Sequence, residues 1–156
     1  MIFIGIDPGK SGAIAVIDGD GKSLGHSVFS WQEYDMIIKH TVSQDNCLAI
    51  VEQVHAMPKQ GVSSCFTFGQ NFGFIQGLLF ANNCPFQEVS PVKWKKYFGL
   101  NKDKNASIMC ATRLFPSLDL RATSRCKKAH DGIAEAYLLA EYGRRMECMK
   151  GLSNGI

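Results

Sequence analysis

The first thirty residues alternate between short apolar runs and turns, which restricts this part of the chain to consecutive β-strands. Residues 2–7 read IFIGID, and an apolar run of this length is typical of a buried strand. The turn PGKSG at 8–12 and the hairpin sequence DGDG at 18–21 flank a second strand at 13–17. A third strand is predicted over 23–30. Strands joined by hairpins pair antiparallel, so the chain begins with an antiparallel sheet.

The rest of the chain alternates helical and strand patterns. An apolar run at 47–51, which ends in Glu52, and a short run at 86–89 predict two more strands. Helices are predicted over 31–42, 62–82, 92–98, 104–115 and 131–146. We therefore expect an α/β fold in one domain, residues 1–156, with a five-stranded mixed sheet flanked by helices. Three of its strands are expected to be antiparallel and two parallel.

Composition indicates an ordinary globular protein, with 46% apolar and 20% charged residues. No apolar run reaches the roughly 18 residues of a membrane helix, and no basic region precedes an apolar stretch at the N-terminus. The six cysteines include no C-x-x-C pair. We therefore expect free thiols, no signal peptide, no membrane association and a cytoplasmic location.

Positive charge is concentrated in one part of the chain. Residues 91–128 hold ten Lys and Arg but only two acids, whereas the remainder holds seven Lys and Arg against twelve acids. A basic segment beside an acidic remainder is consistent with a polyanionic partner. A solvated basic face explains the charge distribution equally well.

Two acids stand where a buried strand gives way to a loop. Asp7 follows the first apolar run, and Glu52 ends the run at 47–51. A buried carboxylate costs free energy unless it is paired, and neighbouring carboxylates repel each other unless a cation lies between them. If the two strands are neighbours, the acids form a cation site. Taken alone, Asp7 is also explained as a turn cap and Glu52 as a surface acid.

A third acid is available at the start of the last predicted helix. Asp131 lies in its first turn, and Glu135 follows one turn later on the same face. Asp131 alone is also consistent with an acid that interacts with the helix dipole. With Asp7 and Glu52 it forms an all-oxygen set that suits Mg²⁺. Phosphodiester hydrolysis uses such sets to hold two metal ions about 4 Å apart.

Four segments resemble successive blocks of a known family. They read IGIDPGKSGAIAVI, AIVEQVHAMPKQGVSSCFTFGQNFGFIQGLL, VSPVKWKKYFGLNKDKNAS and HDGIAEAYLLAEY, and they span about residues 2–142. They resemble the RuvC-type Holliday-junction resolvases, which have the RNase H-like fold. The HDGIAEA block and the short chain look most like the compact versions that viruses of bacteria encode, which implies the host-cell cytoplasm as the location.

The resemblance implies which residues bind metal. Three acids match the family's catalytic and metal-binding positions: Asp7, Glu52 and Asp131. They imply two Mg²⁺ ions, with Mn²⁺ as a substitute. The family has a further Asp or His one turn before the last acid, where this chain has Lys128. Glu135 is one candidate for this fourth ligand, and His130 is the other.

The resemblance also implies residues that contact DNA. His55 takes the place of an aromatic residue that stacks at the junction centre, although it is also explained as a loop histidine. Lys104 is expected to stabilise charge on the scissile phosphate as a catalytic residue, and its alternative is a solvated lysine at a helix start. The other expected contacts with phosphates are Lys59, Lys93, Lys95, Lys96, Lys102, Arg125, Lys127 and Lys128.

The resulting prediction is a Mg²⁺-dependent endodeoxyribonuclease that cuts four-way junctions and other branched DNA. The resemblance implies products with a 5′-phosphate and a 3′-hydroxyl, and no small-molecule cofactor. A two-fold junction calls for a homodimer, which the family builds on the helix corresponding to 62–82. The phenylalanines of this helix are too many for one face, so at least one pair is expected to remain for a partner: Phe66, Phe68, Phe72 and Phe74. The alternative is that all four are covered within the monomer.

Two alternative functions remain open. One is an RNase H-like nuclease that acts on RNA–DNA hybrids or flaps. The other is a protein that binds branched DNA but has a decayed catalytic site, which the missing fourth ligand would explain.

Overall fold

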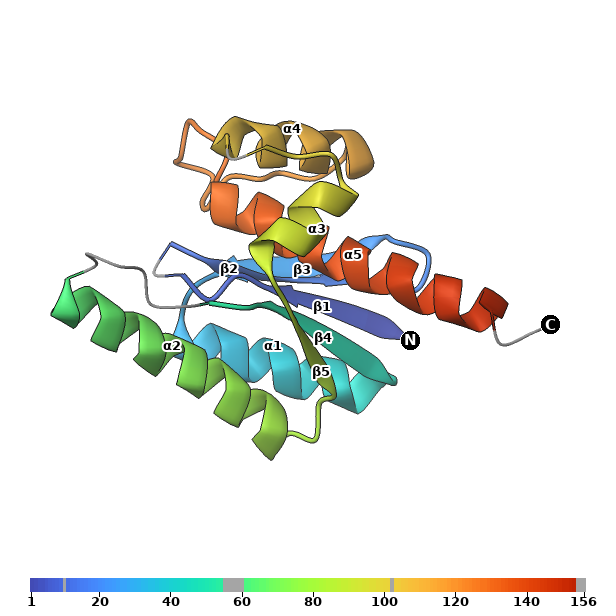
Figure 1. The fold of residues 1–156 in the computed structure, drawn as a ribbon, viewed down its shortest axis with the longest axis horizontal. Helices are drawn as coiled ribbons and strands as arrows, with labels where there is room; N and C mark the ends of the chain where they lie inside the picture. The colour runs from blue at the N-terminus through green and yellow to red at the C-terminus, as the bar shows by residue number, and fades with distance from the viewer. Residues whose placement is uncertain (10, 55–60, 102, 154–156) are drawn as a thin grey trace.

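A five-stranded sheet lies between two layers of helices (Figure 1). The computed structural model describes residues 1–9, 11–54, 61–101 and 103–153, without the side chains of residues 104, 152 and 153. The strands are β1 (Ile2–Ile6), β2 (Ala13–Ile17), β3 (Ser23–Val28), β4 (Cys47–Glu52) and β5 (Phe86–Val89). The helices are α1 (Trp31–Gln44), α2 (Val62–Ala81), α3 (Pro91–Tyr97), α4 (Lys104–Leu114) and α5 (Asp131–Ser153).

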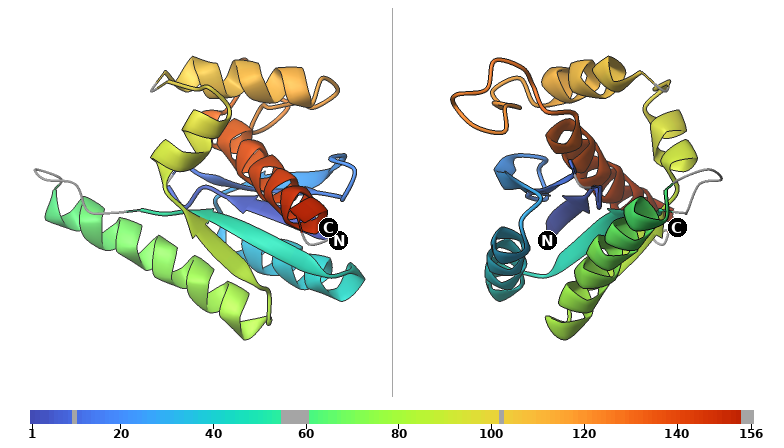
Figure 2. Two further views of the ribbon diagram at one scale, coloured as in Figure 1. Left: turned by 45° about the vertical axis from the view of Figure 1, so that its right-hand side comes forward. Right: turned by 90° about the vertical axis from the view of Figure 1, so that its left-hand side faces the viewer.

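The helices divide between the two faces of the sheet. Helices α1 and α2 cover one face, and α5 crosses the other with α3 and α4 outside it (Figure 2). The strand order is β3-β2-β1-β4-β5. Strand β2 pairs antiparallel with β1 and with β3, whereas β4 pairs parallel with β1 and with β5. The predicted mixed sheet, with three antiparallel strands and two parallel ones, is therefore confirmed.

Each face of the sheet has its own hydrophobic core, because alternate residues of a strand point to opposite faces. In β1, Ile4 and Ile6 pack with the side chains of α1 and α2. Phe3 packs with α5 on the other face, as do Leu48 and Ile50 of β4. The central strands are buried on both faces, which explains their continuous apolar sequences.

Helix α5 lies in very close contact with the middle of the sheet. A Cβ atom on Gly5 of β1 would stand only 1.9 Å from the carbonyl oxygen of Ala136 and 2.5 Å from the backbone nitrogen of Ala140. The two backbones therefore touch without an intervening side chain, which glycine alone permits at this position. This contact determines the distance of α5 from β1.

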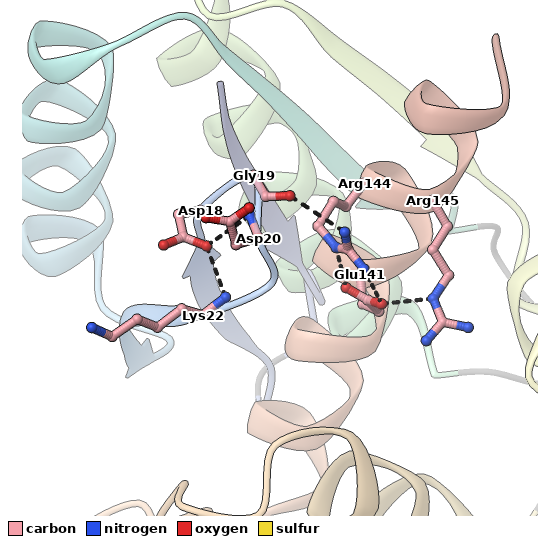
Figure 3. A network of polar contacts seen from close by, with 7 residues as sticks. All are labelled: Asp18, Gly19, Asp20, Lys22, Glu141, Arg144 and Arg145. Carbon is pink, nitrogen blue, oxygen red and sulfur yellow. Dashed lines mark hydrogen bonds and ion pairs between the residues drawn. The ribbon is translucent and has the colours of Figure 1, made fainter. Parts of the chain in front are cut away.

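A polar network connects the β2–β3 hairpin to the C-terminal half of α5 (Figure 3). The buried carboxylate of Glu141 accepts hydrogen bonds from Arg144 Nε at 2.7 Å and from Arg145 Nε at 2.6 Å. Arg144 also donates to the carbonyl oxygen of Gly19 in the hairpin. Burial acts to raise the pKa of Glu141, but the two guanidinium groups hold it below its ordinary value. The ionised carboxylate thus holds this end of the fold together.

The predicted element boundaries differ from the structure mainly at two places. The third strand was expected to reach residue 30 but ends at Val28, because Ser30 caps α1 by accepting the backbone N–H of Glu33. The last helix was expected to end at residue 146 but continues to Ser153. No proline interrupts this extension, and an ion pair one turn apart links Glu147 and Lys150 within it.

Two further features concern the cysteines and the helices. All six cysteines are free thiols, and the sulfur atoms of Cys47 and Cys84 lie 3.4 Å apart without a disulfide bond. In the part of the chain that the structure describes, no helix has both the length and the apolar character needed to span a bilayer.

Candidate active site

Strands β1 and β4 bring Asp7 and Glu52 to neighbouring positions at the carboxyl ends of these two inner strands. Ile6 pairs with Val51 in the parallel ladder, so the next residue of each strand stands at the same level. The two-residue period of a strand turns both acids toward the face that carries α5. The two strands are neighbours, which is the condition under which the sequence brings the two acids together.

The turn after β1 holds the carboxylate of Asp7. Its Oδ1 atom accepts the backbone N–H of Gly9 at 3.0 Å, and its own backbone N–H donates to the carbonyl of Ala13 at 2.9 Å. The chain therefore turns back immediately after Asp7, and the hydrogen bond from Gly9 restricts the orientation of the Asp7 carboxylate.

The start of α5 packs against this same turn. A Cβ atom on Gly132 would lie 2.3 Å from the carbonyl oxygen of Ser11, so the helix begins in contact with the turn that follows Asp7. Asp131, in the first turn of α5, is partly buried there. His130 precedes it, and its Nδ1 atom accepts the backbone N–H of Ile133 at 3.4 Å, as a residue that caps the helix does.

The acids of this region influence one another electrostatically. Burial raises the pKa of Asp7 to about 6, and the negative charges of Glu135 and Asp131 contribute to this increase. Burial likewise raises the pKa of Glu52 to about 7, with contributions from the charges of Asp7 and Glu135. The shifts indicate that acids from β1, β4 and α5 lie within range of mutual repulsion.

Helix α3 supplies partners for two of these acids. The fully buried indole of Trp94 donates its Nε1–H to Glu52 Oε1 at 2.9 Å. The ammonium of Lys95 lies 2.8 Å from Glu135 Oε1, and the Ser107 hydroxyl of α4 donates to the same oxygen at 3.0 Å. The site therefore includes groups from α3 and α4 as well as from the sheet and α5.

The acids of this region have the chemistry of a divalent-cation site, but their side chains are not arranged as metal ligands. Carboxylate oxygens are ligands that Mg²⁺ prefers, and a cation between these partly buried acids would relieve their mutual repulsion. Within residues 1–9, 11–54, 61–101 and 103–153, however, no three His, Cys, Asp or Glu side chains are arranged to hold a metal ion. Two of the acids instead bind other side chains: Glu52 accepts a hydrogen bond from Trp94, and Glu135 pairs with Lys95.

The residues expected to contact DNA divide into three groups. Five have exposed side chains: Lys93, Lys96, Arg125, Lys127 and Lys128. Lys95 is partly buried in its contact with Glu135. His55, Lys59 and Lys102 lie outside the described residues, as does the side chain of Lys104, which was expected to be catalytic.

The sequence did not predict two residues that contact the acids, Trp94 and Ser107. For Trp94 a signal was present, since one large apolar residue among Lys93, Lys95 and Lys96 had to point into the core. Its hydrogen bond to Glu52 joins residues 42 positions apart, and no local pattern predicts such a contact. Ser107 gave no signal, because a serine in a helix is ordinary.

Helix α2 carries an exposed apolar face. Val62, Phe66 and Phe80 are 87%, 69% and 81% exposed. They lie at helical spacing with three exposed glycines that have open space around them: Gly69, Gly73 and Gly77. Of the four phenylalanines singled out in the sequence, Phe66 is exposed, whereas Phe74 stacks on Trp31 at a ring distance of 4.9 Å. The other two are partly buried.

Two solved structures of a RuvC protein are similar to this chain. The structure of T. thermophilus RuvC in complex with a Holliday junction substrate matches 94% of this chain and 96% of its own, with a TM-score of 0.66 and 15% sequence identity. A second Thermus thermophilus RuvC structure matches 94% of this chain and 97% of its own, with a TM-score of 0.62 and 16% identity. No family model and no curated protein sequence matches the chain.

These matches define the fold class. The chain has the RuvC-type, RNase H-like fold over nearly its whole length, as the sequence predicted.

Proposed function

We propose that this protein is a Mg²⁺-dependent endonuclease that cuts four-way DNA junctions, and other branched DNA, as a homodimer. The observation that supports the proposal is that partly buried acids at the ends of β1 and β4 lie side by side, within electrostatic range of the acids of α5, on a RuvC-type fold. Asp7, Glu52 and Asp131 would hold two Mg²⁺ ions, for which Mn²⁺ can substitute. Glu135 is the better candidate for a further ligand, because its charge acts on both Asp7 and Glu52.

The chain's own residues would position the site. The Gly9 N–H holds one carboxylate oxygen of Asp7, and the Trp94 indole holds one of Glu52, so each keeps its second oxygen for a cation. Bound Mg²⁺ would stabilise the charge that develops on the scissile phosphate. We assign charge stabilisation also to Lys104, at the start of α4.

Branched DNA as the substrate is supported by the fold and by the charge distribution. The similar T. thermophilus RuvC structure contains a Holliday junction substrate. The basic segment 91–128 of this chain includes α3 and α4, which lie on the α5 side of the sheet, the side that the candidate acids face (Figure 1). Exposed lysines and arginines there would contact phosphates without reading base sequence. If roughly five phosphates are neutralised, the logarithm of the binding constant should fall with the logarithm of salt concentration with a slope of about −4 to −5.

One gel series tests the proposal. The full chain is incubated with a four-way junction, a flap, an RNA–DNA hybrid and a plain duplex, each with Mg²⁺, with Mn²⁺ or with EDTA. We expect cleavage of the junction with Mg²⁺ but not with EDTA, and junction binding without cleavage for Asp7→Asn. The conservative variant Asp35→Asn on the exposed face of α1 is the matched control and should cut like the wild type.

The other outcomes of this series contradict the proposal in distinct ways. Preferred cleavage of the RNA–DNA hybrid would show an RNase H-like nuclease of another specificity. Junction binding without cleavage by the wild type, in Mg²⁺ and in Mn²⁺, would show a DNA-binding protein with a decayed site.

A further inference from the structure

Helix α3 places a positive charge inside the acidic region. Lys95 Nζ lies 2.8 Å from Glu135 Oε1, and the two side chains are only 26% and 13% exposed. The same carboxylate oxygen also accepts the Ser107 hydroxyl. This ion pair is thus largely withdrawn from water, unlike the pair of Lys39 with Asp35 on the surface of α1, whose lysine is 60% exposed.

The charge of Lys95 acts on more than its direct partner. It opposes the burial that raises the pKa of Asp7 and of Glu52. Its ammonium also lies 5.0 Å from the ring centre of Trp94, whose indole N–H is bonded to Glu52. One ammonium therefore pairs with an acid of α5 and lies within electrostatic range of the acids at the ends of β1 and β4.

We propose that Lys95 is an internal counter-ion that takes the place of a divalent cation at Glu135, and that a cation binds only after Lys95 withdraws. The inference rests on the proposed function, since it concerns the same acids. A divalent ion among them would be repelled by the ammonium and would compete with it for the Glu135 carboxylate. The pair thus stabilises the metal-free fold and lowers the affinity of the site for the cation.

Lys95 is able to withdraw without disturbing the fold. Its ammonium sits on a flexible four-carbon stem, and part of the side chain already reaches solvent beside the exposed Lys96. Trp94, in contrast, is fully buried and keeps its bond to Glu52. The two neighbours on α3 thus have different roles: Trp94 positions an acid permanently, whereas Lys95 holds one only until a cation arrives.

The test compares Mg²⁺ binding by three forms of the full chain. Lys95→Met removes the ammonium and keeps an unbranched stem over Trp94, and Lys96→Met makes the same charge change at the next, exposed position. Isothermal titration with Mg²⁺ alone, without DNA, measures the affinity. We expect Lys95→Met to bind Mg²⁺ about tenfold tighter than the wild type, and Lys96→Met to bind like the wild type.

A second measurement uses the wild type and so does not depend on how a variant folds. An amine-reactive reagent labels lysines, and mass spectrometry compares Lys95 with Lys96. We expect Lys95 to react at least about fivefold more slowly than Lys96 in EDTA, and saturating Mg²⁺ to remove most of that difference.

The outcomes separate this inference from the proposed function. Equal Mg²⁺ affinity of the three forms, or labelling of Lys95 that Mg²⁺ leaves unchanged, would overturn the counter-ion role while the metal site stands. Absence of Mg²⁺ binding in all three forms would overturn the metal site itself, and the counter-ion role with it.

Discussion

Asp7 is held in an environment that opposes its charge. Burial, with Glu135 and Asp131 nearby, raises its pKa from 3.8 to about 6 in the metal-free protein. Because the folded pKa exceeds the unfolded one, the stability that Asp7 contributes is fully present below about pH 4 and is lost as the pH rises through 6. Above pH 6 the ionised side chain destabilises the fold.

Asp7→Asn should therefore stabilise the metal-free protein in a pH-dependent way. The amide keeps an oxygen that can accept the Gly9 N–H but carries no charge. We expect thermal unfolding in EDTA at pH 8 to show a gain of about 1–3 kcal/mol, and at pH 4 a gain close to zero. Asp35→Asn serves as the control and should change little at either pH. An equal gain at both pH values would show that the charge of Asp7 is not the cause.

The sequence predicted the site residues that a local pattern marks, and it missed the contacts that depend on how distant elements pack. Asp7 and Glu52 were predictable because each interrupts an apolar run, and a buried strand tolerates an acid only at its end. The contacts of Trp94 and Lys95 were not predictable, because they depend on how α3 lies against β4 and α5. Lys95 carries the same charge as Lys93 and Lys96 in the sequence, and only the fold distinguishes it.

The contact between β1 and α5 depends on the absence of a side chain at Gly5. Alanine there would place its Cβ 1.9 Å from the Ala136 carbonyl oxygen, so the helix would have to move away from the sheet. We expect Gly5→Ala to lower the free energy of unfolding by about 3 kcal/mol, at the upper end of overpacking effects. Chemical denaturation measures this loss.

A second glycine provides a matched control for this prediction. Gly151, near the end of α5, is exposed, and a Cβ atom added to it would have no neighbouring atom within 4 Å. Alanine at this helical position should stabilise the protein by about 0.5–1 kcal/mol. If both alanine variants changed stability alike, the close contact of α5 with β1 would not be what Gly5 provides.

The ion pairs of Glu141 make the C-terminal half of α5 sensitive to acid. Arg144 and Arg145 hold the pKa of Glu141 below its ordinary value against the effect of burial. Because the pKa of Glu141 is lower in the folded protein than in the unfolded chain, its ionised carboxylate stabilises the fold at pH values above the unfolded pKa of about 4.5. This stabilisation is lost as the pH falls through the pKa of the folded protein. We expect Glu141→Gln to cost about 2 kcal/mol at pH 7, less than a fully buried pair, because both arginines reach water.

The pH dependence identifies the charge as the cause of this loss. The cost of Glu141→Gln should shrink as denaturation is repeated at decreasing pH below about 4.5. Glu147→Gln, which breaks an exposed pair with Lys150 on the same helix, should cost less than about 0.5 kcal/mol throughout. A cost of Glu141→Gln that stayed constant with pH would point to packing and not to the ion pairs.

The order and type of the helices and strands were predictable from the sequence, whereas the residues at which they end were less predictable. Five strands and five helices followed from apolar periodicity and turn sequences, because each segment buries its own face. The end of β3 was missed because the cap at Ser30 competes with strand pairing there. The extension of α5 was missed because residues beyond 146 are mostly solvent-exposed and carry no apolar period.

In the whole molecule, the proposed site and the exposed apolar face lie on opposite sides of the sheet. Helix α5, which the acids face, and helix α2, which carries the exposed Phe66 and Phe80, lie on opposite faces of the sheet (Figure 2). A partner bound to α2 would therefore leave the acids accessible to DNA. A homodimer across α2 would carry two sites, as symmetric cutting of a two-fold junction requires.

The glycines of α2 favour close packing of that helix against a partner. Gly69, Gly73 and Gly77 are exposed at intervals of about one turn, between Phe66 and Phe80. A strip without side chains lets another helix approach the backbone, while the phenylalanines at its ends supply apolar area to bury. We therefore expect wild-type protein to sediment at twice the 17.2 kDa mass of the chain.

Charge on this face should abolish the dimer. Phe66→Glu or Phe80→Glu places a carboxylate at one end of the contact, where the phenylalanine would be buried, and burial of an unpaired charge is costly. We expect both variants to sediment as monomers, to keep their fold by circular dichroism, and to nick junctions singly where the wild type makes paired cuts. Met36→Glu, at a 58% exposed position of α1, should remain dimeric. A monomeric wild type at tens of micromolar, or dimeric Phe66 and Phe80 variants, would rule out α2 as the interface.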